Sequence, residues 1–129
     1  MSQPAWQNRA RELLSDVLPP ERAARSLYDF LLDRFEDLRD GDLRPEVRAR
    51  IWRYVAYCLE PGRHESVRGD AMEGFVRHCL TDASLREELL RELSGCSETV
   101  LEFGPNVIPE LEWQNFLTAA RAVPGWGGI

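Results

Sequence analysis

Residues 20–39 read PERAARSLYDFLLDRFEDLR, and the spacing of their apolar side chains decides the fold class. Apolar residues recur every three or four positions, which is the period of one face of an α-helix. They are Ala24, Leu27, Tyr28, Leu31, Leu32, Phe35 and Leu38. Pro20 fits the first turn because its missing N–H would have no partner there, and we expect Gly41 to end the helix in the left-handed conformation. The segment therefore predicts an amphipathic helix with one face in a core.

The same helical period continues outward in both directions from this segment. It predicts further helices over residues 5–18, 45–60, 66–80, 84–94, 98–103 and 107–122. No segment shows the two-residue alternation that is typical of a half-buried strand. The chain is therefore expected to be all-α, with six or seven amphipathic helices in an irregular bundle or in a short HEAT-like stack of helix pairs.

The expected boundaries rest on length and on local signals. A chain of 129 residues with 43% hydrophobic content fits one domain, and we expect this helical domain over 1–122 with a flexible tail over 123–129. Ser66 is expected to cap the fourth helix, and Ser84 has the capping-box spacing that starts the fifth. Gly104, which Pro105 follows, is expected to end a short helix.

Composition and charge exclude several classes of function. The net charge is −6, and all sixteen basic residues are Arg, a bias that indicates a GC-rich, bacterial genome. An acidic chain lacks the clustered basic surface that nucleic acids and anionic membranes require. The start MSQPAW has no signal-peptide pattern, and no apolar run approaches the ~18 residues of a spanning helix. Cys58 and Cys79 fall on apolar helix faces, which favours a reducing cytoplasm.

The sequence offers little for catalysis. His64 and His78 are the only imidazoles, and neither has the second ligand at one-turn spacing that a zinc site needs. Cys96 is expected to be the one exposed thiol, but no base lies near it in the sequence. The acidic residues of 29–42 are typical of a solvated helix face. We therefore expect no catalytic residue, no metal, no cofactor and no enzyme activity.

Charge and apolar side chains coincide in one stretch, SETVLEFGPNVIPELEWQNF, at residues 97–116. The window 82–112 around it holds eight acids and two Arg, and residues 29–42 hold a second acidic concentration. Patches of one sign steer association, while apolar anchors supply binding energy. The alternative, that these charges only keep the surface solvated, stays open. The expected partner-binding residues are Glu98, Glu102, Phe103, Glu110, Glu112 and Trp113, with Asp37, Asp40 and Asp42 as a second set.

Three segments carry a family resemblance: IWRYVAYCLEPG (51–62), GDAMEGFVRHCLTDASLREELLREL (69–93) and VLEFGPNVIPELEW (100–113). Together they resemble the small helical immunity-type proteins of bacterial toxin systems, over about residues 27–113. The resemblance implies a non-catalytic protein that neutralises a toxin by direct contact, and a basic toxin domain would suit an acidic inhibitor. It carries over no invariant site residue. The competing hypotheses are a helical scaffold that forms homodimers or larger assemblies, and a small enzyme that uses Cys96 or a carboxylate pair.

Overall fold

The computed structural model describes residues 5–17 and 26–126, and every regular element in these ranges is helical. The elements are α1 (Ala5–Leu14), α2 (Leu27–Asp40), α3 (Pro45–Leu59), α4 (Glu65–Ala71), the π-helical turn η1 (Met72–Val76), α5 (Arg77–Cys79), α6 (Ala83–Glu92), the 3-10 turn η2 (Ser94–Cys96), α7 (Ser97–Val107) and α8 (Glu110–Ala120). Because α4, η1 and α5 run on as one helix, the described ranges contain seven helices. The all-α prediction is confirmed.

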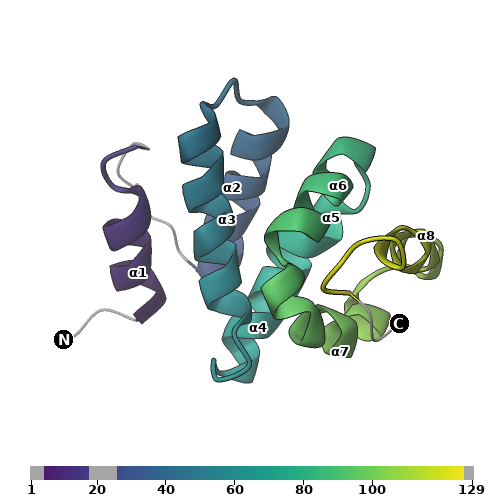
Figure 1. Ribbon diagram of the computed structural model, residues 1–129. Coiled ribbons are helices and arrows are strands. Elements are labelled where there is room, and N and C mark those ends of the chain that lie inside the picture. The colour runs from purple at the N-terminus through teal and green to yellow at the C-terminus, as the bar shows by residue number, and fades with distance from the viewer. Residues whose placement is uncertain (1–4, 18–25, 127–129) are drawn as a thin grey trace.

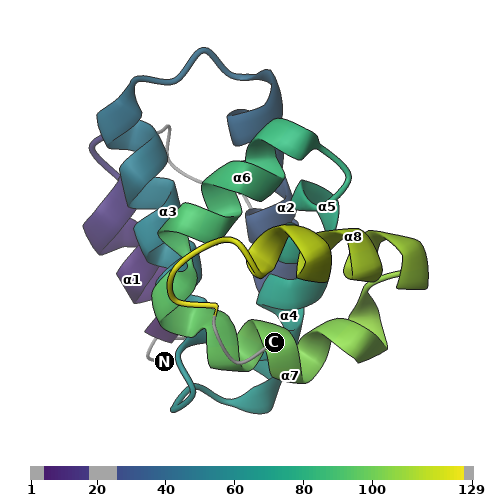
Figure 2. The ribbon, with the colours of Figure 1, turned by 45° about the vertical axis from the view of Figure 1, so that its right-hand side comes forward.

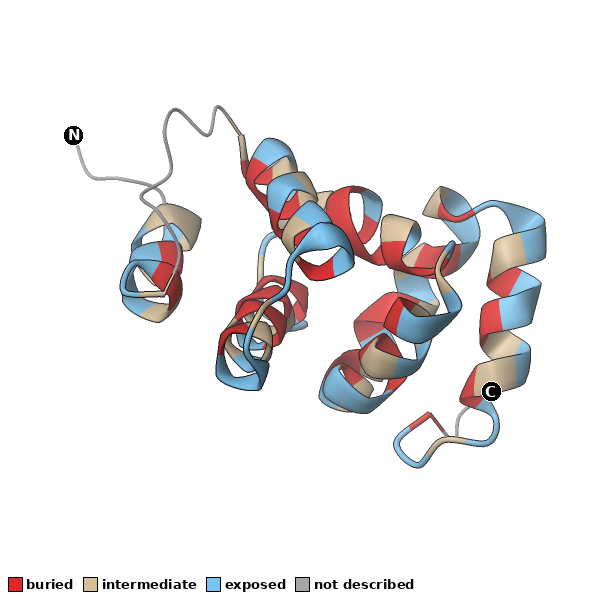
Figure 3. Cartoon of the chain, turned by 90° about the horizontal axis from the view of Figure 1, so that it is seen from above, coloured by how far each residue is buried: buried red, intermediate tan, exposed pale blue. Residues whose placement is uncertain are grey.

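The helices follow one another across the molecule in chain order (Figures 1 and 3). Helix α1 lies at one margin, the antiparallel pair α2–α3 comes next, and α7 and α8 lie at the other margin. The continuous helix of residues 65–79 runs between these parts and contacts α2, α3 and α7. Each helix carries both buried and exposed residues along its length (Figure 3).

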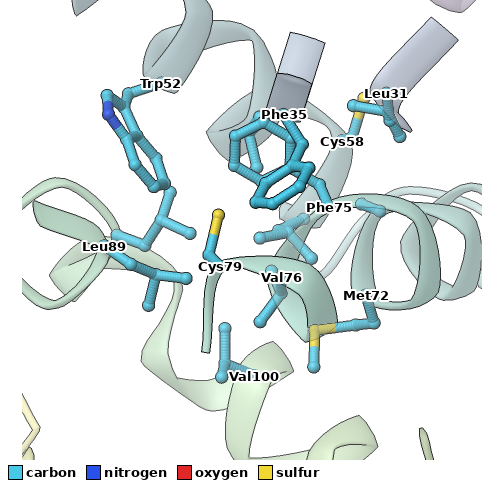
Figure 4. Close-up of a cluster of buried hydrophobic side chains, with 14 of the residues drawn as sticks. Leu31, Phe35, Trp52, Cys58, Met72, Phe75, Val76, Cys79, Leu89 and Val100 are labelled. Carbon is cyan, nitrogen blue, oxygen red and sulfur yellow. The ribbon is translucent and has the colours of Figure 1, made fainter. Parts of the chain in front are cut away.

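The core centres on the π-helical turn in the middle of this helix (Figure 4). Phe75 presents an edge contact to Trp52, with ring centroids 5.2 Å apart, and another to Phe35 at 6.5 Å. Gly74 lies so close to α2 that a Cβ atom would come within 3.1 Å of the Tyr28 carbonyl oxygen. The glycine thus permits the close helix approach that its place in an apolar pattern indicates.

Helix α1 is attached to α3 by polar bonds as well as apolar contacts. The Tyr54 hydroxyl donates a hydrogen bond of 2.9 Å to the Trp6 carbonyl oxygen, and the Trp6 ring packs 6.0 Å from the Phe30 ring. Asp16 and Arg50 form an ion pair at 2.7 Å. Burial raises the pKa of Tyr54 far above its usual value, so its hydroxyl keeps its proton near neutral pH and can donate this bond.

Glu88 on α6 joins three helices through a partly buried polar network. Its carboxylate accepts a hydrogen bond from Trp52 Nε1 at 2.7 Å and two from the Arg48 guanidinium, whose Nη1 also reaches the Leu38 carbonyl oxygen at 3.1 Å. The Glu88 side chain is only 14% exposed. Burial alone would raise the pKa of this carboxyl, but the bonds from Arg48 and Trp52 outweigh burial and hold it below its usual value.

Replacing Glu88 with alanine is expected to lower the free energy of unfolding by about 2 kcal/mol, because Trp52 Nε1 and Arg48 then lose their acceptor. Urea unfolding at pH 7 measures the loss, and the exposed neighbour Glu87→Ala on the same helix is the control. Since the folded-state pKa is lowered, the stabilisation is present above about pH 4.3 and disappears as the pH falls through the folded value. A difference between the two variants that is independent of pH down to 3 would contradict the charged network.

Three expected cap residues are corrected by the structure. Gly41 ends α2 with φ −83° and ψ 146°, which is extended rather than left-handed. His64 caps α4 in place of Ser66, and its Nδ1 accepts from the Ser66 backbone N–H at 3.0 Å. Asp82 caps α6 in place of Ser84, because its carboxylate already accepts the Leu85 N–H at 3.0 Å.

Two further boundaries differ at the C-terminal end. Helix α7 does not end at Gly104 but continues through Pro105 to Val107, and the Ile108 N–H still bonds to the Gly104 carbonyl oxygen at 2.9 Å. Proline near the last turn removes only one helical donor, so the helix tolerates it. Trp126 lies in the segment expected as a flexible tail and is 1% exposed, so the packed part of the chain extends beyond the boundary expected at residue 122. Residues 127–129 lie outside the described ranges, as does the expected helix start at Pro20.

Candidate functional site

Helices α7 and α8 lie at one margin of the molecule (Figures 1 and 2), and both carry acidic residues. Glu98, Glu102 and Glu110 are exposed, and Glu112 is half-buried. Within the described residues Glu98, Glu110 and Glu112 form no ion pair, whereas Glu102 approaches Arg68 Nη1 of α4 at 3.3 Å. This margin therefore presents carboxylates whose charge is largely unbalanced.

Trp113, predicted as a partner contact, is buried against α7 rather than exposed. The side chain is 7% exposed and stacks on Phe116, with ring centroids 5.3 Å apart and an interplanar angle of 20°. Its indole lies against the backbone of Gly104, where a Cβ atom would overlap the ring. Trp113 therefore holds α8 onto α7.

Phe103 is also tied into the fold, although part of its ring remains accessible. The Arg68 guanidinium lies over the Phe103 ring, 5.1 Å from its centroid, and the same Arg68 reaches Glu102. Since one cation contacts both side chains, Glu102 and Phe103 are held side by side by α4. Glu102 and the accessible part of the Phe103 ring are therefore presented together on the α7 surface.

Several of the apolar residues in the stretch 97–116 belong to the core. Val100 and Ile108 are buried. Leu111, in contrast, is 70% exposed, and it is the one large hydrophobic side chain with high exposure among the described residues. Sequence reasoning missed it, although its place two positions before Trp113 puts it near the opposite face of the helix.

The second acidic set lies elsewhere and is largely neutralised. Asp37 bonds to Arg34 Nε at 2.8 Å, and Asp40 bonds to Arg39 Nη2 at 2.7 Å, which lowers the pKa of Asp40. Asp42 is exposed. These residues lie at the α2–α3 connection, at the end of the molecule opposite α7 (Figures 1 and 2). The structure therefore does not bring the two predicted acidic sets into one surface.

The three thiols are all buried, which corrects the expectation that Cys96 is exposed. Cys96 Sγ points to the Ala56 carbonyl oxygen at 3.6 Å, and burial raises its pKa. Burial also raises the pKa of Cys58 to about 12 and that of Cys79 well above its usual value. Thiols of this kind are poor nucleophiles near neutral pH. No group of three or more metal-ligating side chains occurs among the residues that the structure describes.

One surface depression, of about 390 Å³, lies between α1 and the end of α3. Tyr57 is one of its lining residues, and two guanidinium groups lie over its ring, that of Arg63 at 3.7 Å and that of Arg9 at 5.5 Å from the ring centroid. Glu60 and Glu12 in turn pair with these arginines at 2.8 Å each. Because the Tyr57 ring and both guanidinium groups already have partners within the chain, we interpret these contacts as ones that attach α1 to the end of α3.

Comparison with known proteins adds no relative to this description: no family model, no curated protein and no solved structure matches the chain. Among the described residues, no helix combines the length and the apolar character needed to cross a bilayer.

Proposed function

We propose that this chain is a non-catalytic, cytoplasmic protein-binding domain whose α7–α8 margin docks on a basic protein, in the manner of an immunity-type inhibitor of a bacterial toxin. The observation that carries the proposal is the group of carboxylates Glu98, Glu110 and Glu112 on that margin, which form no ion pair with any residue that the structure describes, with Leu111 exposed among them. Basic side chains of a partner could pair with these carboxylates, and Leu111 would supply an apolar contact.

The same charges weigh against the competing scaffold hypothesis. If two copies associated through the α7–α8 margin, the carboxylates of one copy would face those of the other. Like charges brought together across an interface cost free energy, and they slow association at low salt. A basic partner of another sequence avoids this repulsion, so it fits this surface better than a second copy does.

The test starts from a low-salt affinity capture on the immobilised chain, with mass spectrometry to identify the retained protein. The association rate of the purified partner is then measured for the quadruple variant Glu98→Gln, Glu102→Gln, Glu110→Gln and Glu112→Gln. We expect about tenfold slower association at low salt and a flatter salt dependence, because electrostatic steering is lost.

The matched control removes four exposed carboxylates at the opposite end of the molecule. These substitutions are Asp33→Asn, Glu36→Gln, Asp42→Asn and Glu46→Gln, and all four positions are exposed. Equal slowing in both variants would mean that net charge rather than this margin drives association. Unchanged kinetics in the α7–α8 variant would contradict the proposed docking surface, and recovery of only the chain itself would favour the scaffold.

A further inference from the structure

Two arginines connect the turn after α3 to the α7–α8 margin. Arg63 lies in the turn between α3 and α4, and Arg68 lies in α4, which runs beside α7 (Figures 1 and 2). Each guanidinium is placed over an aromatic ring, Tyr57 for Arg63 and Phe103 for Arg68. A planar guanidinium that stacks on a ring is attracted to its face, so each contact favours one arrangement of the two side chains.

The Arg63 side chain folds back on the last turn of α3. Its guanidinium lies 3.7 Å from the Tyr57 ring centroid, and its Nη2 pairs with Glu60 at 2.8 Å. Its Nε donates a hydrogen bond of 3.0 Å to the Tyr57 carbonyl oxygen. The regular helical donor to that oxygen would be residue 61, which is a proline without an N–H. These contacts fix the turn, and with it the direction of the Arg63 carbonyl group.

The Arg68 guanidinium joins this turn to α7. Its Nε donates a hydrogen bond of 3.0 Å to the Arg63 carbonyl oxygen. Its Nη1 approaches the Glu102 carboxylate at 3.3 Å, and the group lies 5.1 Å from the Phe103 ring centroid. The Arg68 side chain is only 17% exposed. One largely buried cation therefore contacts two neighbouring residues of α7 while its own position depends on the turn after α3.

Phe103 needs such a neighbour because its own helix does not fix the ring. A phenylalanine in an α-helix has two common χ1 rotamers, at about 180° and about −60°, and the Phe103 side chain is only half-buried. The ring lies against α4, where a Cβ atom on Gly69 would come within 3.9 Å of Phe103 Cε2. Because Gly69 has no side chain, it does little to hold the ring, and the Arg68 guanidinium supplies a flat surface instead.

We infer that Arg63 and Arg68 are positioning residues of the α7–α8 margin. Arg68 holds the Phe103 ring and the Glu102 carboxylate in one orientation, and Arg63 acts through Arg68. The inference rests on the proposed function, because it gives the two arginines a role in presenting that margin to a basic partner. A side chain that is already ordered loses less conformational freedom when a partner binds. Binding at this edge therefore depends on a turn that lies far from α7 in the sequence.

The test measures the χ1 couplings of Phe103 by NMR in the full chain without a partner. Arg68→Lys keeps a cation near Glu102 but removes the planar guanidinium, and Arg68→Gln removes both. We expect one Phe103 rotamer in the wild type and averaged couplings in both variants. Arg77→Gln is the matched control, because Arg77 is an exposed arginine of the same continuous helix, and there the wild-type couplings should remain.

A double-mutant comparison tests the order of the two arginines. Arg63→Gln frees the turn, so we expect partly averaged Phe103 couplings. Added to Arg68→Gln it should change nothing further, because Arg63 acts through Arg68. Averaged couplings already in the wild type, wild-type couplings in Arg68→Gln, or a further change in the double variant would overturn the inference. Lower stability with unchanged couplings would mean that the arginines only stabilise the fold.

A second measurement uses the basic protein retained in the affinity capture. Arg68→Lys should dissociate from it about threefold faster than the wild type, because Phe103 must then be ordered on binding. The association rate should stay within about twofold, since the charge of the margin is unchanged. Averaged couplings with an unchanged dissociation rate would overturn the docking role of this edge. Failure to capture any basic protein would count against the proposed function itself, whereas the couplings would still decide whether Arg68 positions Phe103.

Discussion

Replacing Trp126 with alanine is expected to lower the free energy of unfolding by about 3–5 kcal/mol, the usual cost of removing a large aromatic side chain from a core. Trp126 is 1% exposed, and its Nε1 donates a hydrogen bond of 2.8 Å to the Leu90 carbonyl oxygen. Its ring stands edge-on to Phe116, with centroids 5.3 Å apart. The substitution would leave a cavity between α6 and α8 and an unsatisfied carbonyl oxygen.

Urea unfolding of the variant measures this loss, and Leu111→Ala is its control. Leu111 is a large apolar residue that is 70% exposed, so its truncation should cost less than about 1 kcal/mol. Trp126→Phe separates the two contributions, because it keeps most of the apolar contact and removes the hydrogen bond. If Trp126→Ala proves as mild as the control, residues 123–126 do not belong to the core.

The sequence could not predict the burial of Trp126, because nothing local specifies it. The tail PGWGGI has no helical period, and its Gly and Pro content is typical of a loop. The placement depends on a space that α6 and α8 create only when they pack. It also depends on Gly125, which has φ +94° and whose Cβ, if present, would come within 2.7 Å of Ser94.

Where a helix is long, its period predicts the core well. In α3 six apolar residues that recur at helical spacing are all buried: Val47, Ile51, Trp52, Val55, Cys58 and Leu59. In α2 the helical period is predicted correctly, but the residues at the edges of the buried face are not. Phe30 is buried without having been assigned to the core, and Tyr28 and Leu32 are only half-buried. The neighbouring helices decide how wide the buried face becomes, and a single helix does not carry that information.

The candidate site was harder to predict than the core because it depends on how two helices meet. Exposure of Glu98, Glu102 and Glu110 follows from their charge. The spacing of Trp113, Phe116 and Ala120 at three and four positions favours one buried face, but the break expected at Gly104 hides the fact that this face of α8 packs on α7. Once the helix continues through Pro105, Gly104 becomes part of the α7 surface that the indole covers.

Gly104→Ala is expected to lower the free energy of unfolding by about 2–4 kcal/mol, although alanine favours helix more than glycine does by about 1 kcal/mol. The new Cβ atom would lie 2.8 Å from Trp113 Cζ2 and closer still to two other ring carbons. The indole would have to move away and would lose its stack on Phe116. Calorimetric or urea unfolding measures the loss of stability, and the near-ultraviolet circular dichroism of Trp113 reports the movement of the ring.

Two comparisons separate this steric effect from the general effect of the substitution. Gly69→Ala is the matched control, because Gly69 is also helical and its Cβ would meet no atom closer than 3.9 Å; there we expect unchanged or slightly higher stability. In a Trp113→Ala background the clash is absent, so Gly104→Ala should cost nothing further, and the double-mutant cycle should show strong coupling between the two positions. Additive losses would mean that Gly104 is required for a reason other than Trp113, and α8 would then be attached to α7 by other contacts.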